Sequence, residues 1–324
     1  MSTLFPWQVQ QWQQIQNSRK ANRLPHALLL SGHTGLGKYG FANHLAAALL
    51  CERPDEQGHA CGQCKSCLLL QAGSHPDIHS VLPEEQGKAI KVDQIRALSD
   101  VMSRKSQLSG YRVCIVSPAE AMNVNASNAL LKTLEEPGEN AMIMLVSSEP
   151  GRLSATIRSR CQLISFMTPE PDISEKWLKE QGVTDQIPLL LGLTNAAPLQ
   201  AMSYVEDNRL QTRGEFMQEF MGLKTGVQNP VQMAAKWVKN HPQHCVQWMM
   251  FWVMDLIRLK SAQSAAPVMN VDVQEHLQQM AKQLDLKNLF NYLDKLQISL
   301  KQLTTQVNAQ MMLEDLFITW IKTR

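Results

Sequence analysis

Hydrophobic residues in the first half of the chain gather in short runs that amphipathic segments separate. The short runs predict strands at residues 27–30, 78–81, 112–116, 142–146 and 161–166. The segments between them repeat apolar residues at helical spacing over residues 38–50, 92–104, 125–134 and 153–159. Strands that alternate with helices form parallel sheets with helices on both faces. Residues 1–166 are therefore predicted to be an α/β domain with a parallel five-stranded sheet.

The pattern changes after residue 166. Thr168-Pro169-Glu170-Pro171 has the composition of a linker, and the periodic segments beyond it have the spacing of helices only. Residues 167–207 predict a small helical domain, with breaks near Gly182 and Pro188.

A larger all-α domain is predicted for residues 208–324. Its long amphipathic helices are expected at residues 246–261, 286–300 and 305–322. The most apolar stretch, residues 245–254, is much shorter than the roughly 20 residues that a membrane span needs, and it predicts a buried helix. We expect the aromatic residues of this stretch to fill the domain's own core: Trp248, Phe251 and Trp252.

Composition narrows the class of protein. Of 324 residues, 44% are apolar and 19% are charged, which is ordinary for a folded protein with real cores. The formal net charge of +2 is too small to give the whole chain a positive electrostatic field that would attract nucleic acid. The first residues, Met1 to Trp7, have neither the cationic start nor the apolar core of a signal peptide. We therefore expect a cytoplasmic chain with no membrane partner.

A glycine-rich motif lies between the first predicted strand and the first predicted helix. It is Gly32-His-Thr-Gly35-Leu-Gly37-Lys38, which matches the phosphate loop G-x-x-x-x-G-K. The backbone N–H groups of such a loop and its lysine hold phosphates at the N-terminus of a helix. The next position is normally a Ser or Thr that ligates Mg²⁺, but here it is Tyr39, whose phenol is too long and rigid for that role. The motif predicts descent from an ATP-binding domain.

A second element of ATP hydrolysis is missing at the end of the third predicted strand. Acidic residues normally follow this strand and hold Mg²⁺ and the attacking water, but Ser117 and Pro118 occupy their places. Two departures in separate segments predict that hydrolysis is lost. Weak nucleotide binding through Lys38 and a purely structural loop both remain open. An active ATPase needs substitute acids, for which Glu120 and Glu135 are the obvious candidates.

Four of the seven cysteines fall close together in the sequence: Cys51, Cys61, Cys64 and Cys67. Cytosolic chains keep their thiols reduced, and the C-x-x-C steps suit a tetrahedral metal ion. The cluster predicts a closed, structural four-thiolate zinc site within an insert at residues 51–67.

Other interpretations of the insert remain. His59 or His75 is an alternative to one of the sulfur ligands, and an iron–sulfur cluster is an alternative to zinc. A zinc-dependent DNA-binding module is a further possibility, although Lys65 is the only basic residue between Cys61 and Cys67.

Further motifs give the chain a family resemblance. His75-Pro-Asp77 precedes the second predicted strand, Asn128-Ala-Leu-Leu-Lys-Thr-Leu-Glu-Glu-Pro137 ends a helix, and Ser159-Arg160-Cys161 precedes the last strand. Together with the phosphate loop and the four-cysteine insert, these segments resemble the bacterial clamp-loader branch of the AAA+ ATPases. The resemblance covers residues 1–166 at the level of motifs and is weaker beyond them.

The resemblance implies a non-hydrolysing subunit of the DNA polymerase III clamp loader, which is part of a DNA-directed DNA polymerase holoenzyme. Such a subunit helps ATP-driven loading of the sliding clamp onto primed DNA, in a hetero-oligomeric ring with motor ATPase subunits and delta. It also implies that residues 167–207 are a lid domain and residues 208–324 a collar domain. Active members carry an arginine sensor where this chain has Leu199. No catalysis is expected from the isolated chain.

By the same resemblance, Arg160 is an arginine finger that acts in trans on ATP bound by a neighbouring motor subunit. Arg158 is the competing candidate, and a plain surface arginine or one that bonds a helix end is the alternative for Arg160 itself. The other function that we consider is an active AAA+ motor or repair ATPase.

Overall fold

The protein is described from a computed structural model that covers residues 4–85, 87–108, 110–239, 242–262, 267–303 and 307–323. The chain divides into two compact units, Met1–Ile173 and Ser174–Arg324. The start of the helix predicted at residues 305–322 lies outside the described residues.

A parallel five-stranded sheet forms the centre of the first unit, in the strand order β2-β3-β4-β1-β5. The strands are β1 (Ala27–Ser31), β2 (Ile78–Val81), β3 (Arg112–Val116), β4 (Ala141–Ser147) and β5 (Gln162–Ser165). Leu29 of the central strand pairs in register with Leu145 on one side and Leu163 on the other. The strands β3 and β4 are buried along their whole length because helices cover both faces of the sheet. The predicted sheet is confirmed.

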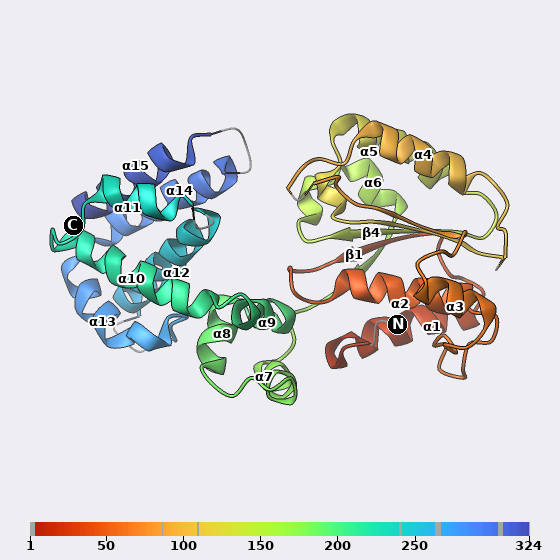
Figure 1. Ribbon diagram of the computed structural model, residues 1–324, viewed down its shortest axis with the longest axis horizontal. Helices are drawn as coiled ribbons and strands as arrows, with labels where there is room; N and C mark the ends of the chain where they lie inside the picture. The colour runs from red at the N-terminus through yellow and green to blue at the C-terminus, as the bar shows by residue number, and fades with distance from the viewer. Residues whose placement is uncertain are drawn as a thin grey trace. The chain divides into compact units, whose positions relative to one another are not determined.

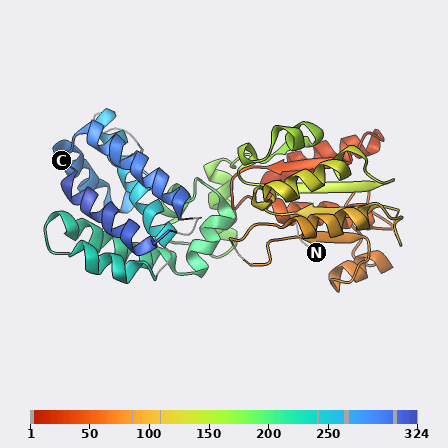
Figure 2. The same ribbon diagram turned by 90° about the horizontal axis from the view of Figure 1, so that it is seen from above.

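Helices form a layer on each face of the sheet, as Figures 1 and 2 show. One layer contains α1 (Val9–Lys20), α2 (Lys38–Leu50) and α3 (Lys65–Gln71). The other contains α4 (Val92–Met102), α5 (Val124–Glu135) and α6 (Ala155–Arg160). The described residues of this unit also form three short 3-10 helices: η1 (Pro6–Gln8), η2 (Ala119–Ala121) and η3 (Pro150–Arg152).

The helix α1 was not predicted because its sequence is rich in glutamine and has few apolar residues. Trp12 and Ile15 face the interior, and so do the polar side chains of Gln11 and Gln16. The helix therefore buries a mixed face that a count of apolar residues does not detect.

Helices make up the described part of the second unit. They are α7 (Pro171–Glu180, which begins in the first unit), α8 (Ile187–Leu193), α9 (Pro198–Glu206), α10 (Arg209–Lys224), α11 (Pro230–Trp237), α12 (Pro242–Ser261), η4 (Val271–Val273), α13 (Gln274–Gln283), α14 (Leu286–Gln302) and α15 (Ala309–Lys322). The break that was predicted near Pro188 lies just before this residue, at the start of α8. Proline fits in the first turn of a helix because the backbone N–H that it lacks has no hydrogen-bond partner there.

The core of the second unit is aromatic. Fully buried rings from α10, α11, α12 and α15 pack together: Phe216, Phe220, Trp237, Trp248, Trp252, Phe317 and Trp320. Trp248 and Trp252 thus fill the domain's own core, as expected. Phe251 packs instead against a neighbouring cluster that includes residues of α8 and α9.

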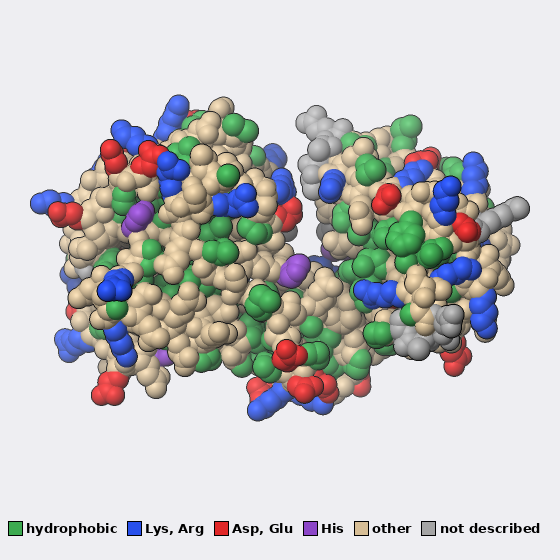
Figure 3. Space-filling model, turned by 180° about the vertical axis from the view of Figure 1, so that it is seen from behind, with side chains coloured by type: hydrophobic (Ala, Val, Ile, Leu, Met, Phe, Trp, Pro, Cys, Tyr) green, Lys and Arg blue, Asp and Glu red, His purple; other side chains and the backbone are tan. Residues whose placement is uncertain are grey.

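No helix among the described residues is long and apolar enough to cross a membrane. On the face of the molecule in Figure 3, Lys and Arg side chains are scattered among other residues over both units and do not gather in one patch. This distribution agrees with the small net charge of the chain.

Candidate functional site: a closed phosphate loop, a four-cysteine cluster and an exposed arginine

The phosphate loop joins β1 to α2, as the sequence predicted. Gly35 and Gly37 adopt φ values of 83° and 77°, which glycine accepts at no steric cost. A Cβ atom on Gly32 would lie 2.3 Å from the carbonyl oxygen of Phe166, so the loop also needs glycine for close packing against the strand end. The structure therefore retains the backbone shape of a phosphate-binding loop.

The side chain of Lys38 folds back into its own loop. Its Nζ donates to the carbonyl oxygens of Gly32 at 2.6 Å and His33 at 2.7 Å, and to the Oγ of Ser148 at 3.2 Å. The residue is only 5% exposed. Burial lowers the pKa of Lys38 from 10.5 to about 8, although the nearby carboxylate of Glu120 acts in the opposite direction. The cation that would meet a phosphate is held by acceptors of the protein itself.

An N-terminal segment that the sequence analysis missed closes the outside of the loop. The indole of Trp7 donates to the carbonyl oxygen of Leu36 at 3.0 Å, and the amide of Gln8 donates to the same oxygen at 2.8 Å. A Cβ atom on Gly37 would lie 2.7 Å from the ring of Phe5. The segment was detectable in part, because Pro6 in the first turn of η1 and Gln8 two positions later are helix-start signals.

The segment that follows β3 reaches this loop through Glu120. Ser117 and Pro118 follow the strand directly, and neither has a carboxylate. Glu120, in η2, accepts a hydrogen bond from the backbone N–H of Ser148 at 2.9 Å through Oε1. Its Oε2 is buried and has no hydrogen-bond partner among the described residues. Glu120 is thus the one acid of those proposed from the sequence that the fold brings to the Lys38 end of the loop.

We expect Lys38→Met to lower the free energy of unfolding by about 1–3 kcal/mol, because the loop carbonyls lose a buried donor. The pKa of Lys38 is about 8 in the folded chain and remains near 10.5 in the unfolded chain. Between these pH values the unfolded chain binds more protons, so the contribution of Lys38 to stability rises with pH. Urea unfolding at several pH values between about 8 and 10.5 should show this rise in the native chain but not in the variant. Unchanged stability together with lost nucleotide binding would contradict this structural role.

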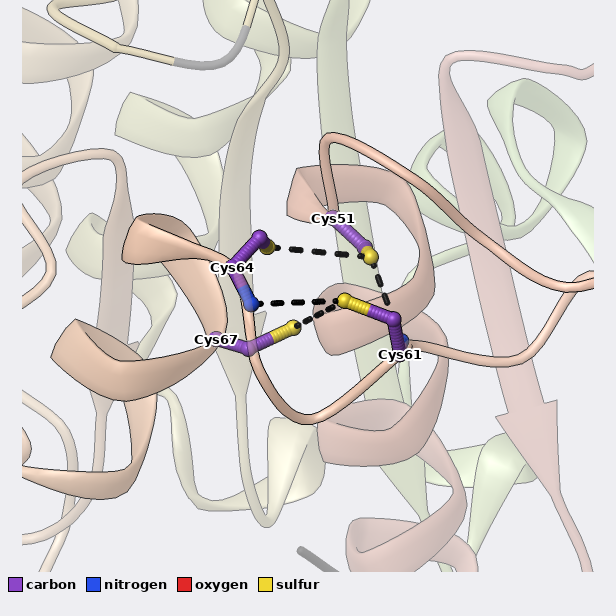
Figure 4. A group of neighbouring side chains, drawn as sticks. All are labelled: Cys51, Cys61, Cys64 and Cys67. Atoms are coloured by element: carbon purple, nitrogen blue, oxygen red, sulfur yellow. Dashed lines mark hydrogen bonds between the residues drawn. The ribbon is translucent and has the colours of Figure 1, made fainter.

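The four clustered cysteines come together at the end of α2 and the start of α3 (Figure 4). Their sulfur atoms all lie within 4.8 Å of one another. The Cys51–Cys64 and Cys61–Cys67 sulfur pairs are 3.9 Å and 4.0 Å apart, too far for disulfides. A tetrahedral ion with sulfur ligands at about 2.3 Å places those sulfurs about 3.8 Å from one another. The cluster fits a single metal ion better than a multi-iron cluster, in which other atoms separate the thiolates.

The electrostatics of the cluster also suit a metal. Hydrogen bonds from the backbone of Gln63 and Cys64 lower the pKa of Cys61 to about 6, so this group supplies a thiolate at neutral pH. Burial raises the pKa of Cys51 and of Cys67, and thiolates at those positions need a nearby positive charge. A bound cation would provide that charge.

The two histidines considered as alternative ligands are engaged elsewhere. His59 Nδ1 lies 2.9 Å from His44 Nε2, and its ring stacks on Trp12. His75 accepts from the backbone N–H of Asp77 at 3.1 Å through Nδ1, and its Nε2 lies 2.8 Å from the Oγ of Ser66. Among the described residues, the group that converges as metal ligands contains the four cysteines only.

Arg160 is the last residue of α6, and its guanidinium makes two contacts. It donates through Nη1 to the carbonyl oxygen of Thr156 at 3.0 Å and through Nη2 to Oε1 of Glu135 at 2.6 Å. Its side chain is 35% exposed. Arg158 is exposed, and its side chain has no hydrogen bond or ion pair to any part of the chain that the structure describes. Leu199, the position of the missing sensor, lies in the first turn of α9.

Comparisons with known proteins place the whole chain in a family. The sequence profile described as "DNA polymerase III, delta subunit" matches residues 7–170, and "DNA polymerase III, delta subunit, C terminal" matches residues 207–322. The chain is 32% identical to "DNA polymerase III subunit delta'" of Pseudomonas aeruginosa, over 99% of this chain and 98% of that protein. It is also 32% identical to the Escherichia coli protein of the same name, over 97% of this chain and 94% of that protein.

A solved structure, a DNA polymerase III gamma subunit-related protein of Thermotoga maritima, matches 96% of this chain and 99% of that one at 16% identity. Its TM-score of 0.45 is too low to add to the argument.

The parallel sheet with a phosphate loop before α2, followed by an all-α unit, defines an AAA+ type P-loop protein. The two profile matches and the nearly full-length similarity give the particular family. The chain belongs to the DNA polymerase III subunit delta' family.

Proposed function

We propose that this chain is a non-hydrolysing subunit of the DNA polymerase III clamp loader. It presents Arg160 to ATP bound on a neighbouring motor subunit while the complex loads the sliding clamp onto primed DNA. The observation that carries the proposal is the contrast between two cations: Lys38 is buried in its own loop, whereas Arg160 stands at the surface on a helix end.

The chemistry of phosphoryl transfer supports this division of roles. The transition state carries charge on the transferred phosphoryl oxygens, and an arginine supplied in trans stabilises it without any ATP site on its own chain. The chain's own loop lacks the Mg²⁺ ligand at Tyr39 and the acids at Ser117 and Pro118. Its lysine donates instead to two carbonyl oxygens of the loop itself.

The partners follow from the same proposal. Motor ATPase subunits and delta form the hetero-oligomeric ring, residues 208–324 contribute to its collar and residues 167–207 correspond to a lid. The sliding clamp and primer–template DNA are reached through the assembled complex. The four cysteines hold a structural zinc ion, which fastens the insert to the end of α2 and has no open position for a substrate.

Glu120 is the observation that favours a second candidate, an active ATPase. Its buried Oε2 lies without a hydrogen-bond partner among the described residues, at the end of the loop where a metal ligand belongs. Against this candidate, its Oε1 already binds the backbone of Ser148, and Tyr39 supplies no hydroxyl at the Mg²⁺ position.

The purified chain alone is expected to release no phosphate from ATP, because no group in its loop holds Mg²⁺ or orients the attacking water. Phosphate release should be compared for the native chain, Lys38→Met and Glu120→Gln. Equal background in all three identifies a contaminating ATPase. Activity that disappears in either variant would establish the active-ATPase function instead.

The proposed function also predicts that mixing the chain with motor subunits yields a stable complex that hydrolyses ATP.

A further inference from the structure

The guanidinium of Arg160 is held between two helices. Its Nη1 bonds a carbonyl oxygen of its own helix α6, and its Nη2 bonds the carboxylate of Glu135, the last residue of α5. Glu135 is 51% exposed, and it lies 25 residues away in the sequence from Arg160. The two helices pack against each other, so the partner comes from a rigid neighbour.

We propose that Glu135 is a positioning residue that holds Arg160 ready for the ATP of the neighbouring subunit. This inference rests on the proposed function of Arg160. A free arginine side chain samples many rotamers, and ordering it costs entropy when it meets its target. A contact that orders the side chain beforehand reduces that cost in the assembled complex.

The geometry allows Arg160 to bind Glu135 and a phosphate together. A guanidinium has five N–H donors in a rigid fork, and the two contacts use one donor on each terminal nitrogen. The Nε–H and the second hydrogen of each terminal nitrogen remain to donate to phosphoryl oxygens. Glu135 therefore does not have to release the guanidinium when ATP is engaged.

Breaking this ion pair by mutation is expected to change the free energy of unfolding very little. Both side chains are substantially exposed, and exposed ion pairs contribute little to folding. The adjacent Glu136 is also exposed, and its side chain makes no hydrogen bond or ion pair in the part of the chain that the structure describes. Glu136→Ala is therefore a matched control that removes one carboxylate from the same turn without touching Arg160.

The test is single-turnover phosphate release at the ATP site that Arg160 serves, in the fully assembled clamp loader with variant chains. Glu135→Ala is expected to lower the rate at this site about tenfold with little change in ATP affinity, because a loosely held group is misplaced in the transition state. Glu135→Gln keeps an acceptor oxygen and should recover part of the loss. Glu136→Ala should behave as the native chain.

A double-mutant cycle separates positioning from a general structural effect. If Glu135 acts through Arg160, Glu135→Ala combined with Arg160→Ala should be no slower than Arg160→Ala alone. Additive losses, or native turnover in Glu135→Ala when Arg160→Ala is slow, would overturn the inference but leave the finger assignment intact. Native turnover in Arg160→Ala would reject the finger assignment, and the inference with it.

Discussion

Replacing Arg160 with alanine is expected to slow ATP hydrolysis about 10³-fold at the site that it serves in the assembled clamp loader. The side chain would contribute positive charge where charge develops in the transition state. Single-turnover phosphate release measures the effect best. Steady-state turnover of the whole complex should fall less, because its other ATP sites do not use Arg160.

Two further variants make this prediction specific. Arg160→Lys keeps a positive charge but loses the planar fork of donors, so most of the loss should remain. Arg158→Ala should leave hydrolysis unchanged, since Arg158 projects from α6 two residues away without the contacts that hold Arg160. A native rate in Arg160→Ala and a slow rate in Arg158→Ala would transfer the role to Arg158.

Assembly must be measured beside the rate. Arg160 has only exposed contacts, at the end of a six-residue helix, so its removal should leave the fold and the complex intact. Loss of the complex in gel filtration would show that Arg160 serves an interface, and the slow rate would then say nothing of transition-state charge.

The sequence predicted the central strands of the sheet well because they are buried on both faces. Such strands appear as continuous apolar runs, like Val113 to Val116, and a helix between them such as α4 keeps a clear 3.6-residue period. The glycines of the phosphate loop were equally informative, since few other structures require glycine at those spacings between a strand and a helix.

Long-range contacts were the part that the sequence did not reveal. Ser148, 110 residues after Lys38, supplies one of the acceptors for its ammonium group. Glu135 meets Arg160 only because α5 and α6 pack together. Neither pairing leaves a local pattern. The glutamine-rich α1 was missed for a related reason, because the buried amide of Gln11 finds its partner, the carbonyl oxygen of Ser165, far along the chain.

These contacts change how the lost ATPase site is interpreted. Absent catalytic residues alone fit a loop that merely binds nucleotide weakly. In this structure, however, the buried Lys38 donates to the carbonyl oxygens of Gly32 and His33. The carbonyl oxygen of Leu36 accepts from the side chains of Trp7 and Gln8. These contacts stabilise the loop by bonds within the protein itself. We therefore propose that the phosphate loop of this chain is a structural element of the domain and that its chemistry is confined to Arg160 of α6.

Cysteine spacing predicted the metal ligands, but only the structure gives the sulfur separations that match one tetrahedral ion. We expect the purified chain to contain about one zinc ion, by elemental analysis. Iron with the visible absorption of a sulfide cluster would reject zinc. Removal of the metal by a chelator should release the insert, because structural zinc sites contribute roughly 10–16 kcal/mol to folding in small zinc domains.

Cys64→Ser tests this site with little other disturbance. Cys64 is the N-cap of α3, and serine is a preferred N-cap residue, so the start of the helix should survive while one metal ligand is lost. The expected result is loss of bound zinc and fast hydrogen exchange across residues 51–67. Cys161→Ser, outside the cluster, is the matched control and should keep its zinc.

The rest of the first unit should respond much less to metal loss. The sheet has its own hydrophobic core, and the insert joins it mainly at the end of α2, where Ser66 Oγ donates to the carbonyl oxygen of Leu50 at 2.6 Å. The indole of Trp12 also donates to the backbone of Gln57 at 3.1 Å, so α1 should loosen together with the insert. Protected amides in β3 and β4 with exposed ones in the insert would establish the zinc ion as a local fastener. Unfolding of the whole unit without zinc would show instead that the insert is part of its folding core.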